Sequence, residues 1–203
     1  LGAGWLEAAI EGHAAAPADT YPAVWDRWND STPEEQVAGC LEWDARLVER
    51  YEALSDTELA AARVQLFGQM DLDGRGLVRL RLKEHAVHTW DIAVAFDPNA
   101  VVAADAVAVV VDEVAGVAGY FGHPTGETRR VRIRTTDPER ALVMEVGEGV
   151  ALRPAGSGSG ADWSGPADLT LPAEVLVRLV YGRARTGDGV PEHVARVFAP
   201  QSV

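Results

Sequence analysis

The chain has 203 residues, enough for one large domain or two small ones, and its formal net charge is −13. So acidic a surface repels phosphate backbones, which argues against nucleic acid and anionic membranes as partners. No apolar run approaches the ~20 residues that cross a bilayer, and no signal peptide is visible at the start. Cys40 is the only cysteine, so an internal disulfide is excluded and we expect a cytoplasmic protein.

Helix signals dominate the first half of the chain. Residues 1–16 are expected to form a helix that is already under way, since no capping residue precedes it, and this suggests that residues are missing upstream. Residues 17–28, dense in Pro and Trp, are expected to form a loop. Thr32-Pro33-Glu34-Glu35 is a strong helix start that predicts a helix to about Leu54, and a further helix is expected over 57–70.

Strand signals begin after a helix expected over 104–120. Alternating, β-branched segments on either side of Asp137-Pro138 predict two antiparallel strands. The Gly and Ser run at 156–160 contains no Lys, so we expect a turn or mobile loop rather than a phosphate loop. The remaining expected elements are strands at 150–153 and 167–171 and helices at 172–181 and 191–198. The predicted fold is α+β, with a helical domain at 1–124 and an α+β domain at 125–203, divided near 122–128.

The organising helix signal, free of Gly and Pro, covers residues 77–95. At about 100° per residue, one narrow stripe contains Leu77, Glu84, His88, Asp91 and Ala95. Apolar residues flank this stripe, so we expect it to point into the protein, where two carboxylates and an imidazole are costly unless they are paired. Glu84 and His88 are one turn apart and can converge on one point. They are therefore candidate ligands of a divalent metal such as zinc.

Other interpretations of these side chains stay open. Glu84 and His88 can instead form a simple hydrogen-bonded pair, with Arg81 nearby. His85 points about 100° away from Glu84 and is expected at the surface or behind the ligands. Asp91 lies one turn beyond His88, where it can orient the imidazole through the second ring nitrogen or cap a polar cluster.

The stretch Glu84-His85-Ala86-Val87-His88-Thr89-Trp90-Asp91-Ile92 resembles the metal-binding helix of the mycothiol-dependent maleylpyruvate isomerase family, which has a DinB-like four-helix bundle. Residues 163–169 and 179–183 are similar to that family's small α+β, sterol-carrier-like C-terminal domain. The resemblance implies a His–Glu–His zinc site in which Glu84 and His88 are two of the three ligands. The third ligand is expected just before Leu1; His13 could replace it only if the first helix were shifted by some three turns.

The resemblance also implies a reaction. Zinc would bind the thiol of mycothiol, a cosubstrate, and hold it as a thiolate, which adds to the cis double bond of a small electrophile such as maleylpyruvate. Arg183 is the candidate catalytic cation that orients substrate carboxylates, and Arg81 is the second, substrate-binding candidate. Arg183 can equally neutralise the C-terminal carbonyls of the helix before it.

The expected function is that of a zinc- and mycothiol-dependent isomerase or S-transferase, a monomer or weak homodimer that acts on a small-molecule electrophile. The alternative is a non-catalytic protein that holds a small apolar ligand in its second domain, with a structural metal or none. A third interpretation, an acidic regulatory partner protein, rests on charge alone.

Overall fold

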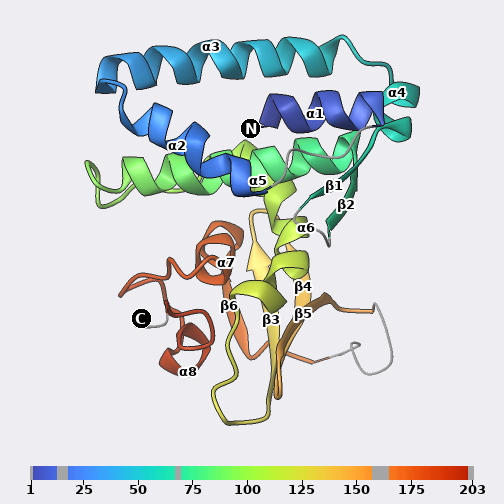
Figure 1. The fold of residues 1–203 in the computed structure, drawn as a ribbon. Helices are drawn as coiled ribbons and strands as arrows, with labels where there is room; N and C mark the ends of the chain where they lie inside the picture. The colour runs from blue at the N-terminus through green and yellow to red at the C-terminus, as the bar shows by residue number, and fades with distance from the viewer. Residues whose placement is uncertain (1, 13–17, 67–69, 157–164, 201–203) are drawn as a thin grey trace. The chain divides into compact units, whose positions relative to one another are not determined.

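A computed structural model describes residues 2–12, 18–66, 70–156 and 165–200 of the chain (Figure 1). Its helices and strands confirm the predicted α+β class. Two compact units make up the structure, Leu1–Arg81 and Leu82–Val203. Within the described ranges, no helix combines the length and the apolar character that a membrane span requires.

The first unit is mainly helical, with one small hairpin. Strands β1 and β2 pair antiparallel, with Arg63 opposite Asp73. The elements are α1 (Gly2–Glu11), η1 (Ala18–Thr20), α2 (Tyr21–Asn29), α3 (Pro33–Glu52), α4 (Asp56–Ala61), β1 (Arg63–Leu66), β2 (Met70–Asp73) and the first part of α5 (Gly74–Ala93). Its buried core consists of Leu6, Ala9, Leu47, Ala62, Val64, Leu66 and Leu77.

Capping boxes start two of these helices. At α3 the Thr32 hydroxyl accepts the Glu35 N–H at 3.2 Å, and the Glu35 carboxylate accepts the Thr32 N–H at 2.8 Å. Ser55 and Glu58 make the same reciprocal pair at α4. Each box satisfies two N–H groups that a helix N-terminus otherwise leaves without partners. The predicted starts of both helices are thereby confirmed.

The loop predicted over residues 17–28 is wrong, because most of this segment is the helical pair η1 and α2. Pro22 lies in the first turn of α2, where its missing N–H costs nothing. Tyr21 is buried, and its hydroxyl accepts the Trp5 indole N–H at 3.2 Å. Aromatic packing on α1 therefore holds the segment helical.

The helix predicted over 57–70 is also wrong beyond Ala61, where β1 begins after one residue. In β1, Val64 and Leu66 are buried while Arg63 and Gln65 are exposed, which is the two-residue period of a strand. The β1–β2 pairing supplies the backbone hydrogen bonds that a helix would have made. Residues 67–69 lie outside the described part of the chain.

The second unit is built on a sheet of order β5-β4-β3-β6. Strand β3 runs antiparallel to β4 and parallel to β6, and α6 packs against α7 and β5 (Figure 1). After the last part of α5, the elements are α6 (Ala104–Phe121), β3 (Arg129–Thr136), β4 (Arg140–Val146), β5 (Val150–Pro154), β6 (Leu169–Pro172), α7 (Ala173–Val180) and α8 (Glu192–Ala195). These elements confirm the strands and helices predicted in this half of the chain.

The chain passes from the first hydrophobic core to the second within α5, and not after α6. Leu77 of α5 belongs to the first core, whereas Val87 and Trp90 belong to the second, together with Val110 and Val114 of α6. The compact units therefore divide between Arg81 and Leu82. The predicted limits, 1–124 and 125–203, follow the change from helix to strand in the sequence instead of these cores.

Candidate functional site

The predicted metal ligands Glu84 and His88 lie on the exposed face of α5. Their side chains are 47% and 62% exposed, so the predicted inward orientation is wrong for these two residues, although Leu77 of the same stripe is buried. Val87 and Trp90 take the buried face instead. The Trp90 indole N–H donates to the Ala100 carbonyl at 2.9 Å, which anchors that face of the helix against the following chain.

Glu84 and His88 nevertheless converge as their spacing predicts. The His88 Nε2 atom lies 3.4 Å from the Glu84 Oε2 atom. The other ring nitrogen, Nδ1, lies 3.0 Å from the Asp91 Oδ2 atom. In the tautomer that donates from Nδ1 to Asp91, the Nε2 lone pair points toward Glu84.

The Glu84–His88 pair fits two positions of a zinc shell. An oxygen and a nitrogen ligand at tetrahedral angles around zinc are about 3.3 Å apart, close to the observed 3.4 Å. The same distance is longer than the usual N–H···O hydrogen bond of about 2.7–3.2 Å. Within the residues that the structure describes, no group of three or more His, Cys, Asp and Glu could hold a metal. His13 lies outside those residues.

Arg183 holds Asp91 with a two-pronged contact. Its Nε and Nη2 atoms donate to the two Asp91 oxygens at 2.6 and 2.7 Å. The Arg183 guanidinium, followed by the hydrogen bond from His88, lowers the pKa of the Asp91 carboxyl, and Asp91 in turn raises the pKa of Arg183. The Arg183 Nη1 atom also donates to the Tyr181 carbonyl at 2.6 Å, at the C-terminal end of α7. Arg183 therefore both neutralises a helix end and orders the α5 cluster.

Gly182 places Arg183 in this position. Its φ of +76° is in the left-handed region that ends helices, and a Cβ there would lie 2.8 Å from the Phe198 carbonyl oxygen. The Arg183 N–H donates back to the Arg178 carbonyl at 2.8 Å. The chain turns sharply at this glycine, which brings a guanidinium 92 residues away in sequence onto Asp91.

Tyr181 is a member of the cluster that sequence reasoning did not assign. Its ring is buried, and burial, aided by the negative charges of Glu84 and Glu113, raises the pKa of its phenol to about 12. The hydroxyl therefore stays neutral and can donate a hydrogen bond. The segment Leu179 to Arg183 was singled out by resemblance, but only the packing of α7 shows that its tyrosine lies within the field of Glu84.

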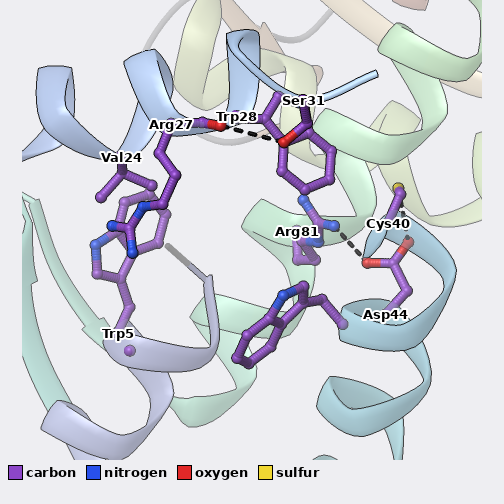
Figure 2. Close-up of a pocket in the computed structure, with 10 residues that line it drawn as sticks. Trp5, Val24, Arg27, Trp28, Ser31, Cys40, Asp44 and Arg81 are labelled. Atoms are coloured by element: carbon purple, nitrogen blue, oxygen red, sulfur yellow. Dashed lines mark hydrogen bonds and ion pairs between the residues drawn. The ribbon is translucent and has the colours of Figure 1, made fainter. Parts of the chain in front are cut away.

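Arg81, the second predicted cation, lies three residues before Glu84 on α5 and lines a pocket of the first unit (Figure 2). Its Nη2 atom donates to the Asp44 Oδ1 atom at 2.5 Å. Arg81 and Arg183 thus each bind an aspartate of their own unit. Arg81 lines a cavity of the first unit, whereas Arg183 lies beside Asp91 in the second unit.

In a comparison with protein families, residues 1–93 match the model described as the mycothiol maleylpyruvate isomerase N-terminal domain. Comparisons with curated proteins and with solved structures each found no match. The matched segment spans α1 to α5 and includes Glu84, His88 and Asp91. The match supports the family that the α5 motif indicated, whose N-terminal domain is DinB-like, over residues 1–93.

Proposed function

We propose that this chain acts as a zinc- and mycothiol-dependent enzyme that uses an activated thiolate on a small electrophile, as an isomerase or an S-transferase. One observation carries the proposal. Within the matched N-terminal segment, Glu84 and His88 present an oxygen and a nitrogen atom 3.4 Å apart, and Asp91 contacts the other ring nitrogen of His88.

Each residue of the α5 cluster has a separate role in this proposal. Glu84 and His88 would hold zinc, which when bound lowers the pKa of a coordinated thiol. Asp91 fixes the tautomer and orientation of the imidazole, as carboxylates commonly do for metal-binding histidines. Arg183 holds Asp91, so we assign it a positioning role in place of the substrate contact inferred from sequence. The neutral hydroxyl of Tyr181 is available as a hydrogen-bond donor to an anionic substrate.

A non-catalytic role is the second candidate, and two observations favour it. Both Glu84 and His88 are largely exposed, and the described residues supply no third donor. A catalytic zinc site uses three protein ligands and keeps one position open. With two donors alone, a cation would be held weakly, and the domain would serve as a ligand-binding scaffold.

Metal analysis of the intact protein tests the proposal. We expect about one zinc per chain, and we expect His88→Ala and Glu84→Gln to lose it, because each removes one of the ligands. Asp91→Asn should weaken zinc binding by roughly 10–100-fold, the usual effect of removing a carboxylate behind a ligand. Calorimetric titration with zinc after chelation measures each affinity.

The control variant is His193→Ala, which removes an exposed imidazole on α8. It should bind zinc as the unchanged protein does. Zinc-loaded protein should then accelerate mycothiol-dependent isomerisation of maleylpyruvate or conjugation of another electrophile. A folded protein without zinc, or zinc retained in His88→Ala, would contradict the metal site; zinc binding without any thiol chemistry would leave the scaffold role.

A further inference from the structure

The first unit contains a pocket of about 660 Å³ that the metal pair does not line (Figure 2). This volume is in the range of small-molecule sites. The lining residues come from α1, α2, α3 and α5 and the turn after α2; they are Gly4, Trp5, Val24, Arg27, Trp28, Ser31, Cys40, Trp43, Asp44 and Arg81. Figure 2 shows Trp5, Val24 and Arg27 along one side and Arg81, Asp44 and Cys40 along the other.

Indole rings form much of the wall. Trp28 and Trp43 expose 40% and 55% of their surface, which is unusual for such large apolar side chains unless something covers them. A Cβ at Gly39 would lie 3.2 Å from the Trp28 ring, so the glycine lets this indole lie directly on α3. Tryptophan faces favour flat, conjugated ligands, because stacking adds to the apolar burial.

The pocket carries positive charge in an otherwise acidic chain. The charged lining residues are two arginines, Arg27 and Arg81, and one carboxylate, Asp44. The chain as a whole has a net charge of −13. The Arg81 Nη2 atom is bound to Asp44, but the Arg81 Nε atom is buried and has no hydrogen-bond partner among the described residues. The Arg81 side chain as a whole is 41% exposed and lines the pocket, so its guanidinium is open to an anionic ligand there.

We propose that this pocket binds a planar aromatic carboxylate, with its ring against the tryptophans and a carboxylate oxygen on the Arg81 guanidinium. The assignment is independent of the metal proposal, because Glu84 and His88 are not lining residues. A neutral aromatic compound would lose the charge-assisted hydrogen bond, and an aliphatic acid would lose the stacking.

Isothermal titration with 2-naphthoate, and with 2-naphthylmethanol as its neutral counterpart, tests the proposal on the intact protein in the presence of a metal chelator. We expect the acid to bind at least about tenfold more tightly than the alcohol, since one hydrogen bond to a charged group separates them. Adding zinc should leave the affinity for 2-naphthoate unchanged. Equal affinity for acid and alcohol, or no binding of either, overturns the proposal.

Two substitutions should change the affinity in opposite directions. Arg81→Gln should weaken 2-naphthoate binding about tenfold or more, because it removes the charged donor. Asp44→Asn should strengthen binding, because it removes the competing carboxylate and frees the Arg81 Nη2 atom. This second variant keeps the test decisive if Arg81→Gln does not fold.

Arg75→Gln is the matched control, since Arg75 lies on α5, pairs with Asp56 and does not line the pocket. It removes the same charge and should leave the affinity for 2-naphthoate unchanged. If Arg75→Gln weakened 2-naphthoate binding as much as Arg81→Gln does, the loss of affinity would follow from the change in net charge. This would contradict a specific site. Failure here leaves the zinc measurement untouched, because the two sites share no residue.

Discussion

Asp91 connects the groups of the α5 cluster, because its two oxygens serve two partners. Oδ2 contacts both the His88 Nδ1 and the Arg183 Nη2 atoms, and Oδ1 accepts from the Arg183 Nε atom. The carboxylate must be ionised to accept from both, and its lowered pKa shows that the folded protein favours this form. Stability and imidazole orientation therefore depend on one charge.

This dependence predicts how Asp91→Asn responds to pH. A carboxyl group whose pKa is lowered on folding stabilises the protein above its ordinary value of 3.8, and this contribution is lost as pH falls through the lower folded value. We therefore expect the urea midpoint of the unchanged protein to exceed that of Asp91→Asn at neutral pH, with the difference shrinking below pH 3.8.

Urea unfolding at a series of pH values measures this difference. Glu148→Gln, an exposed turn substitution, is the control and should shift the midpoint little at any pH. A difference between the unchanged protein and Asp91→Asn that stays constant into strong acid would show that the carboxylate charge does not hold the cluster.

At the scale of the element, α7 depends on a buried charge in its last turn. Arg178 is 1% exposed, and its guanidinium binds Glu174 one turn earlier and Asp188 in the following loop, at 2.6 Å from each. The ring of Trp90 lies 5.3 Å from this guanidinium. Burial of Arg178 is tolerable because both carboxylates neutralise it and satisfy its donors.

Asp188→Ala should therefore destabilise the protein by about 3–5 kcal/mol, the usual cost of breaking a buried ion pair from one side. Asp188→Asn should cost less, since an amide oxygen can still accept the Arg185 N–H that Asp188 binds at 2.6 Å. Chemical denaturation measures both free energies of unfolding. A loss below about 1 kcal/mol for Asp188→Ala, the level of exposed pairs, would contradict the buried triad.

Local signals predicted elements well where the chain caps itself. The Thr32 and Ser55 boxes start α3 and α4 because their partners lie within three residues. The hairpin β1–β2 was missed because its backbone pairs with a neighbouring strand, and the helix α2 was missed because contacts such as the Trp5–Tyr21 hydrogen bond hold it. Helical propensity cannot report a partner that lies elsewhere in the chain.

At the scale of the whole molecule, the chain has two hydrophobic cores that both draw on α5. Leu77 lies in the core that includes Leu66, whereas Val87 lies in the core that includes Val110 and Ile133. The change occurs within three helical turns, as the buried face moves from Leu77 to Val87. The first part of α5 thus packs in one hydrophobic core and its last part packs in the other.

Substitutions at these two positions should weaken different parts of the molecule. Leu77→Ala should lower the stability of the first core by about 2–5 kcal/mol and raise hydrogen exchange in β1 and β2. Val87→Ala should instead raise exchange in β3 and β4, because its cavity opens in the second core. Native-state hydrogen exchange with mass spectrometry separates the two patterns; identical patterns would show a single cooperative core.

The spacing of Glu84, His88 and Asp91 along α5 is a local property, and it alone predicted that these side chains converge and that Asp91 reaches His88. The direction in which the stripe faces was not local. Ala86, Val87 and Trp90, with Leu82 beside them, pack into the second core, and this leaves the imidazole of His88 on the exposed face of α5. Hydrophobic periodicity fixes the direction of the buried face around the helix axis only to within about one residue, so it does not decide on which side of that boundary His88 lies.

Tertiary structure also decided which cation meets Asp91 and where a ligand cavity forms. Arg183 reaches Asp91 across 92 residues because Gly182 turns the chain after α7. Arg81 lines a cavity because four helices bring the indoles of Trp5, Trp28 and Trp43 and the carboxylate of Asp44 around it. Sequence supplies the chemistry of each side chain, while burial and distance, which set its partners and its pKa, arise only when distant segments pack together.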